Sequence, residues 1–275
     1  MKNILIIARK EIQEGLRNRW VVAVTLLLAS LALTLSFLGS APTGNVGAGR
    51  LDIIIVSLSS LTIFLVPLIA LLLSHDAIVG EMERGTLLLL LSYPVGRRQV
   101  VLGKFLGHTL ILSVATFVGY GAAGAALVVA GTAVDPGSWI AFATMIGSSI
   151  LLGTVFIAIG YLLSASVTQR SSAGGMALGI WLFFVIIYDM GLLGALVSTK
   201  GEGFSPGLVS ALLIGNPTDA YRLLNLGSHT AGSVSSIAGV AANSMLTPGL
   251  LVTSLFLWVA IPLLLAMLRF SRREL

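Results

Sequence analysis

The sequence has no cysteine and little charge. Without cysteine, the chain has no disulfide, no thiolate metal site and no redox-active thiol. Charged residues make up only 10% of its 275 residues, and hydrophobic residues make up 56%. An average soluble domain carries about 25% charged residues. This composition excludes a soluble globular protein, because there is too little charge to cover a water-facing surface, and it indicates a membrane protein.

The motifs of common catalytic and metal sites are also missing. The stretch most similar to a phosphate-binding loop is Gly96–Phe105, but it has six residues between Gly96 and Gly103 where four are needed. In addition, Phe105 replaces the hydroxyl residue that would hold magnesium. No His-Glu-x-x-His motif occurs. The methionines and histidines are dispersed, which does not favour a copper path. We expect no catalytic residue, no bound cofactor and no metal site in this chain.

Long apolar runs are what the chain does contain. A helix needs about 20 mostly apolar residues to cross a hydrocarbon core of about 30 Å. The runs predict an all-α integral membrane protein with six transmembrane helices in a domain of residues 20–268. The predicted spans are residues 20–38, 52–73, 105–130, 139–163, 174–196 and 249–268.

The basic residues predict how these spans are oriented. Six spans place both termini on one side. If that side is the cytoplasm, only Arg50, Lys200 and Arg222 lie outside, which leaves 13 of the 16 Lys and Arg residues inside. Because these charges flank spans, the net charge of +5 does not indicate nucleic-acid binding. The bias predicts a cytoplasmic segment 74–104, an extended periplasmic segment 198–247 and a basic cytoplasmic tail 269–275.

Residues 1–19 carry too many charges for a signal peptide. On a helical wheel, four apolar and four polar residues separate onto opposite sides: Leu5, Ala8, Ile12 and Leu16, against Lys10, Gln13, Glu14 and Arg17. This pattern predicts an amphipathic helix that lies in the cytoplasmic membrane interface. The alternative is a basic flank that only orients the first span.

Charge gathers in the segment 74–104. Its apolar run Leu87–Leu91 is too short to span a bilayer and predicts a short helix at the inner interface. The acidic residues beside this helix predict a docking face for a cytoplasmic partner. A solvated loop is the alternative.

A family resemblance rests on this segment. The pattern Asp76-x4-Glu81-x-Glu83-Arg84-Gly85-Thr86-Leu87, followed by Leu91-Ser92-x-Pro94-x2-Arg97 and Gly103-Lys104, resembles the ATP-binding-cassette (ABC) type-2 permeases. The opening Arg9-Lys10-Glu11 with Leu16-Arg17-x-Arg19-Trp20 resembles their N-terminal interface helix. The resemblance implies a homodimer whose subunits each contact a cytoplasmic ATPase, which binds ATP and Mg. The residues implied for ATPase coupling are Arg17, Asp76, Glu81, Glu83, Arg84, Gly85, Thr86, Leu87 and Arg97.

The run Leu213–Asn225 in the segment 198–247 resembles permeases of nitrous-oxide reductase maturation systems. That resemblance implies a bacterial inner-membrane location, support for assembly of the reductase copper site, and a periplasmic copper-handling partner. The residues expected to dock this partner are Asn216, Pro217, Asp219, Tyr221, Arg222 and Asn225. From the residues alone, packing in the outer membrane interface is the alternative.

Asp189 is the only carboxylate well inside a predicted span. Intramembrane acids are costly, so it is a candidate for a cavity or gating role, unless it reaches water at the outer face. The expected output of the complex is solute export or a conformational signal. A non-transporting scaffold or mechanotransmitter is the alternative. A secondary transporter would need paired buried acids and internal repeats, and the sequence shows neither.

Overall fold

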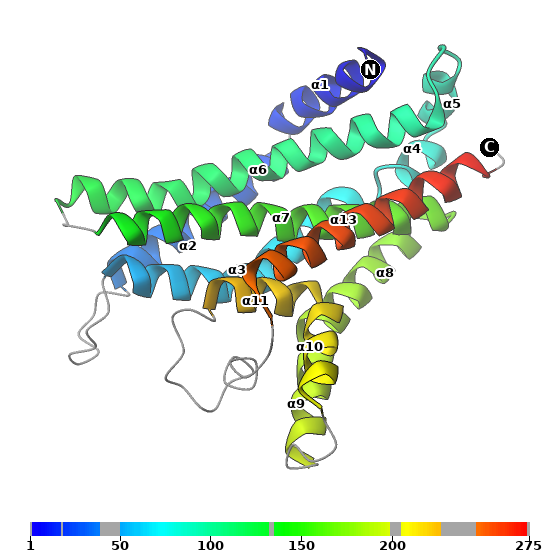
Figure 1. The fold of residues 1–275 in the computed structure, drawn as a ribbon. Helices are drawn as coiled ribbons and strands as arrows, with labels where there is room; N and C mark the ends of the chain where they lie inside the picture. The colour runs from blue at the N-terminus through cyan, green and yellow to red at the C-terminus, as the bar shows by residue number, and fades with distance from the viewer. Residues whose placement is uncertain are drawn as a thin grey trace.

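The computed structural model describes residues 2–17, 19–38, 50–131, 135–198, 205–226 and 246–273 (Figure 1). The regular elements in these ranges are helices, which confirms the predicted all-α class. They are α1 (Lys2–Arg17), α2 (Arg19–Leu38), α3 (Arg50–Ser74), α4 (Val79–Glu83), α5 (Thr86–Leu91), α6 (Arg97–Val129), α7 (Pro136–Ser166), α8 (Arg170–Leu182), the π-helix η1 (Phe183–Ile187), α9 (Tyr188–Ser198), α10 (Pro206–Gly215), α11 (Pro217–Leu226) and α13 (Pro248–Ser271).

Five helices in the described ranges are long and apolar enough to cross a membrane. They are α3, α6, α7, the continuous helix α8–η1–α9, and α13. Five predicted spans therefore correspond to membrane-length helices. The stretch Val21–Leu35 of α2 is apolar but shorter, so the first span stays a prediction.

The helix α7 is the centre of the bundle and packs against α3, α6 and α13 (Figure 1). It begins with Pro136, whose fixed φ suits the first helical position, and the Asp135 carboxylate accepts a hydrogen bond from the Gly137 N–H at 2.8 Å. After this cap, the helix continues without a charged residue to Ser166. It buries more of its apolar stretch than any other span.

Glycines allow α1 and α2 to approach α6 closely. A Cβ on Gly103 would lie 2.7 Å from the Ile7 Cβ, and one on Gly107 would lie 2.5 Å from the Glu11 Cβ. The two glycines are four residues apart, so they share one face of α6. The face that α1 turns toward α6 includes Ile7 and Glu11, while Leu5 is exposed. Leu5 belongs to the apolar side that was expected to face the membrane interface, and this placement of the helix stays a prediction.

Both termini lie at the end of the bundle that carries α4 and α5 (Figure 1). The Asn3 side-chain amide donates to the Pro94 carbonyl and to Gln99 Oε1, each at 3.3 Å. At the other terminus, Arg97 donates to the Phe270 carbonyl at 3.2 Å and to the Arg273 carbonyl. The Phe270 carbonyl belongs to the last turn of α13, where carbonyls need partners from outside the helix, and Arg273 follows the helix end.

The segment predicted as periplasmic, 198–247, contains two described helices. The helix α10 packs beside α9, away from the bundle, while α11 lies against α3, α7 and α13 (Figure 1). The remainder, residues 199–204 and 227–245, lies outside the described residues. The central part of this long segment is therefore helical, and one of its helices lies among the membrane-length helices.

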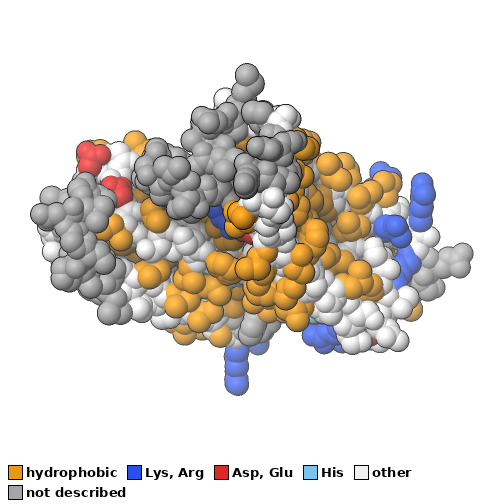
Figure 2. Space-filling view, turned by 90° about the horizontal axis from the view of Figure 1, so that it is seen from below, with side chains coloured by type: hydrophobic (Ala, Val, Ile, Leu, Met, Phe, Trp, Pro, Cys, Tyr) orange, Lys and Arg blue, Asp and Glu red, His pale blue; other side chains and the backbone are white. Residues whose placement is uncertain are grey.

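Exposed hydrophobic side chains cover much of the outer surface. On the face in Figure 2, they occupy the middle, and several Lys and Arg side chains gather toward one end. The exposed hydrophobic side chains of the whole molecule include Phe117, Ile140, Leu178 and Phe256, which are 64%, 69%, 53% and 58% exposed. Apolar patches on this scale mark a surface that faces something other than water, as expected for a membrane-embedded bundle.

Candidate coupling site

The predicted short helix Leu87–Leu91 is present as α5, one residue longer at its start. Gly85 separates it from α4 with a φ of 70°, a left-handed conformation that favours glycine. Leu87 is buried, whereas Leu88 and Leu89 are 58% and 69% exposed. The helix α5 is thus anchored by one leucine and presents two others outward.

The acidic residues of the coupling segment are bound by partners within the protein, although Glu83 remains exposed. Asp76 pairs with Arg170 at 2.9 Å, and Glu83 accepts a hydrogen bond from the Arg170 backbone N–H at 2.7 Å. Glu81 pairs with Lys104 at 2.8 Å. These contacts hold α4 and the preceding turn against α6 and the start of α8. Glu81 is therefore turned inward while Glu83 stays on the surface, and the docking of a partner on these acids stays a prediction.

Lys104 joins three helices. Its ammonium group lies 2.8 Å from Glu81 of α4 and 2.6 Å from Glu11 of α1, although Lys104 itself is a residue of α6. Only 3% of Lys104 is exposed. A buried charge is tolerated when it is paired and hydrogen-bonded, and here one cation serves two carboxylates. We call Glu11, Glu81, Lys104 and His108 the ion cluster.

His108 extends the ion cluster to α7. Its Nε2 lies 3.5 Å from Glu11 Oε2, and its Nδ1 lies 2.9 Å from the Tyr161 hydroxyl. Burial alone would raise the pKa of Glu11, but the hydrogen bond with His108 and the charge of Lys104 lower that pKa to about 2. The Glu11 carboxylate is therefore ionised at neutral pH. A polar cavity of about 220 Å³ borders the cluster and Arg84.

The other residues predicted for ATPase coupling do not form one surface. Arg97 is used inside the protein, where it donates to the end of α13 and lies over the Phe270 ring. Arg17 is exposed on the last turn of α1, and Arg84 and Thr86 are exposed between α4 and α5. The burial of Lys104 and His108 in one cluster was not predicted from the sequence. Their spacing of four residues, which places both on one face of α6, was the available signal.

The residues predicted to dock a periplasmic partner are mostly buried around α11. Asn216, Asp219 and Tyr221 are completely buried, and Asn225 is 6% exposed. The Tyr221 hydroxyl lies 3.0 Å from Ser149 Oγ, and Asn225 Oδ1 accepts a hydrogen bond from Ser148 at 3.1 Å. In this conformation, these side chains contact the protein's own helices. Pro217 is buried at the start of α11.

Asp189 does not stand alone in its span. Arg222 binds Asp189 with one guanidinium nitrogen and Asp219 with another, the latter at 2.6 Å. Asp189 Oδ1 is buried and has no hydrogen-bond partner in the described part of the chain. The buried Asp219 and the partly buried Asp189 therefore share one arginine between α9 and α11. This pair was not predicted from the sequence, because Asp219 lies outside the predicted spans.

The π-helix η1, in the middle of the same helix, is hydrogen-bonded to the start of α11. The wider turn of η1 disturbs the regular hydrogen-bond ladder. The Phe184 carbonyl accepts hydrogen bonds from Asn216 Nδ2 at 3.0 Å and from Thr218 Oγ1 at 3.1 Å. Asn216 also donates to Asp219 at 3.0 Å. The start of α11 is thereby fixed to the middle of the helix 170–198.

Comparison with known proteins decides the family. The model of the "ABC-2 family transporter protein" family matches residues 5–275. The chain belongs to the ABC-2 transporter family. The "Probable ABC transporter permease protein NosY" of Pseudomonas aeruginosa is 47% identical over 268 residues, which cover 97% of both chains. The protein of the same name from Stutzerimonas stutzeri is 47% identical over 276 residues, which cover 99% of both chains.

These matches confirm the resemblance drawn from the coupling segment and the run Leu213–Asn225. The ABC-2 permease is a multi-span membrane subunit, and family membership indicates a non-catalytic one. In the described part of the chain, no group of three or more His, Asp or Glu side chains is arranged to hold a metal ion.

Proposed function

We propose that this ABC-2 permease couples ATP hydrolysis on a separate cytoplasmic ATPase to solute export or to a conformational signal across the bacterial inner membrane. ATP and Mg bind the ATPase and not this chain. The ion cluster carries the proposal. Because Lys104 binds both Glu11 and Glu81, a displacement of α4 and α5 is passed directly to α1 and α6. Coupling between distant sites requires such a physically connected element.

The proposed topology has six spans and cytoplasmic termini. An even number of crossings is supported by the position of both termini at the end that carries α4 and α5 (Figure 1). The basic residues Lys2, Arg98 and Arg272 fall at this end, which favours its location in the cytoplasm.

The ATPase contact is proposed to involve α5 and not the acidic residues. Leu88 and Leu89 are exposed, and Tyr93 is 68% exposed, whereas Asp76, Glu81 and Glu83 bind internal partners. Exposed aromatic and aliphatic anchors are typical of a protein interface. Arg84 and Thr86 flank this surface.

Charge placed on α5 tests this contact. Leu88→Asp with Leu89→Asp is expected to abolish copurification of the ATPase and its stimulation by the permease. Val129→Asp is the matched control, because Val129 is 88% exposed at the opposite end of α6. If the double variant retained the ATPase as fully as the control, α5 would not be the docking element.

The NosY names of the relatives support a role in maturation of the nitrous-oxide reductase copper site, with a periplasmic copper-handling subunit as partner. The second candidate function is a non-transporting mechanotransmitter for that partner. The attachment of α11 to η1 and α9 favours it, because a change in the helix 170–198 is passed to the segment that follows. Transport of a labelled solute by reconstituted vesicles would favour export, whereas ATP-dependent partner binding without transport would favour mechanotransmission.

We propose that the helix 170–198 forms the interface of a homodimer. Only 11% of its most apolar stretch is buried. A Cβ on Gly175, Gly179, Gly191 or Gly194 would meet nothing within 4 Å. Unopposed small residues allow a second helix to approach closely in lipid. Oxidation of a Met190→Cys variant, at a position that is 71% exposed, is expected to crosslink two copies. Val129→Cys is expected to stay monomeric.

A further inference from the structure

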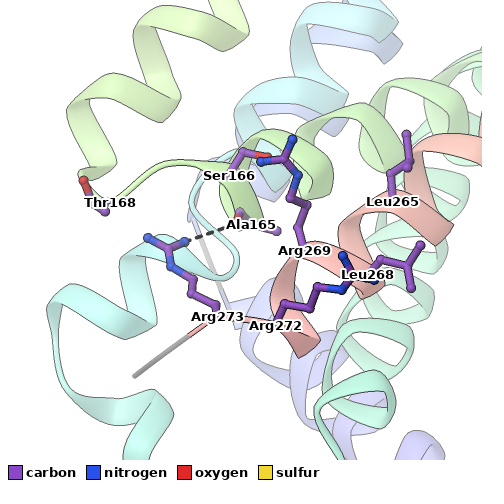
Figure 3. A pocket seen from close by; sticks show the side chains of 8 residues that line it. All are labelled: Ala165, Ser166, Thr168, Leu265, Leu268, Arg269, Arg272 and Arg273. Atoms are coloured by element: carbon purple, nitrogen blue, oxygen red, sulfur yellow. Dashed lines mark hydrogen bonds between the residues drawn. The ribbon is translucent and has the colours of Figure 1, made fainter.

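A cavity of about 510 Å³ lies between the last turn of α7 and the last two turns of α13 (Figure 3). It lies at the end of the bundle where the chain terminates. The residues that line it are Ala165, Ser166, Thr168, Leu265, Leu268, Arg269, Arg272 and Arg273. None of these is acidic, so the lining combines three guanidinium groups with no carboxylate.

Two of the three arginines have no partner among the described residues. Arg273 donates to the Ala165 carbonyl at 3.2 Å, as Figure 3 shows. The guanidinium groups of Arg269 and Arg272 make no ion pair or hydrogen bond within the described ranges, and both side chains are exposed. Three like charges around one cavity repel each other, and an anion held between them would remove that repulsion. Arginine presents a planar fork of donors that suits phosphate oxygens.

An apolar track leads away from these arginines along α13. Ile261, Leu264, Leu265 and Leu268 are 54%, 54%, 45% and 45% exposed. Their spacing of three, one and three residues places them on one face of the helix. The last two line the cavity itself. The ligand that fits therefore has an anionic head and an apolar body, which a free phosphate ion lacks.

The helix end that carries the arginines is held in place. Arg97 donates to carbonyls of the last turn of α13, and its guanidinium lies 5.8 Å from the centroid of the Phe270 ring. Phe270 is completely buried. Helix ends that lack such contacts fray, so these contacts keep Arg269 and Arg272 on the same side as the leucine track.

We propose that this cavity binds the phosphate headgroup of an anionic phospholipid. Arg269 and Arg272 hold the phosphate, and the acyl chains lie along Ile261, Leu264 and Leu268. Basic pockets between transmembrane helices on the cytoplasmic side are a known physical solution for binding anionic lipid heads. The proposal requires a membrane-embedded chain and does not depend on the proposed coupling to an ATPase.

Native mass spectrometry of the full chain in detergent tests the proposal. Phosphatidylglycerol and phosphatidylcholine are added in turn, and the lipids retained per chain are counted. The wild type is expected to retain phosphatidylglycerol preferentially. Arg269→Gln with Arg272→Gln is expected to lower that retention about tenfold or more, because each basic residue near the site contributes to the attraction.

Arg9→Gln with Arg98→Gln is the matched control, since both arginines are exposed at the same end and the charge change is equal. In a second measurement, inorganic phosphate is added at millimolar concentration, and it should not displace the lipid. The proposal would be overturned if the Arg269 and Arg272 variant kept the wild-type preference, or if the control lost as much. Displacement by inorganic phosphate alone would instead assign a free-anion site. The melting temperature of each variant verifies folding.

Discussion

Lys104 is a buried charge on which the packing at the end of the bundle that carries α4 and α5 depends. A lysine that is 3% exposed loses nearly all its hydration, and only its two carboxylate partners compensate. Removal of one member of a buried ion pair costs about 3 to 5 kcal/mol, because the remaining charge stays buried and unpaired. Here, removal of the lysine would leave two such charges.

Lys104→Met is therefore expected to lower the melting temperature sharply and to release α1 for proteolysis. Lys10→Met is the control, because the Lys10–Glu14 pair is exposed, with 52% and 62% of the two side chains accessible. Glu11→Leu and Glu81→Leu, added to Lys104→Met, should restore much of the lost stability. Equal melting temperatures for Lys104→Met and Lys10→Met would contradict the assigned role.

The lowered pKa of Glu11 predicts a pH dependence. Its folded value of about 2 lies below the reference value of 4.5. The carboxylate therefore contributes stability that is fully present above about pH 4.5 and is lost as the pH falls through about 2. The stability advantage of the wild type over Glu11→Gln should be constant from pH 7 to 5 and shrink below that. Thermal unfolding in detergent across this range measures it, and an advantage that grows with acidity would refute it.

At the scale of the helices, close crossings depend on single glycines. Gly103 faces Ile7, and a Cβ there would also lie 2.9 Å from the Ile4 carbonyl oxygen. Backbone oxygen cannot move aside as a flexible side chain can. The added methyl must therefore push α1 away from α6, which also lengthens the contact between Glu11 and Lys104.

Gly103→Ala is expected to destabilise the protein by about 1 to 3 kcal/mol through overpacking. Gly121→Ala on the same helix is the matched control. Its Cβ would meet nothing within 4 Å, and alanine has the higher helix propensity by about 1 kcal/mol. Thermal unfolding should show a lower melting temperature than wild type for Gly103→Ala and a higher one for Gly121→Ala. If both were neutral, the close approach of α1 would not limit packing.

At the scale of the whole molecule, the topology is open to a direct measurement. The chain has no cysteine, so a maleimide can label only the single cysteine that is introduced. Ser92 is exposed near α5, and Val129 is exposed at the opposite end of α6. An impermeant maleimide added to spheroplasts should label Val129→Cys and leave Ser92→Cys unlabelled until the membrane is disrupted. Labelling of Ser92→Cys from outside would reverse the proposed orientation.

Several features of the molecule were predictable because they depend on local composition. Uninterrupted apolar runs predicted the membrane-length helices α3, α7 and α13 close to their observed bounds, whereas α6 begins at Arg97, eight residues before the predicted span. The five-residue run Leu87–Leu91 predicted α5. These features need no knowledge of distant contacts, since a backbone in lipid must satisfy its own hydrogen bonds and forms helices.

Other features could not be predicted, because they depend on partners far away in the sequence. Glu11 and Lys104 are 93 residues apart, and only the approach of α1 to Gly103 and Gly107 brings them together. Asp219 looked like a polar residue outside the spans, yet Arg222 and Asn216 hold it in the interior beside Asp189.

The sequence by itself determined that this protein is an all-helical membrane protein of the ABC-2 family, because hydrophobic length and local motifs are written along the chain. The tertiary structure alone decided which way its charged residues face. A carboxylate on a helix is stable when it faces water and also when it faces a buried cation. Which of the two it faces depends on the rotation and packing of the helix. That choice placed Glu81 on Lys104 and Asp219 on Arg222, and it left Leu88 and Leu89 of α5 and the arginines at the end of α13 exposed.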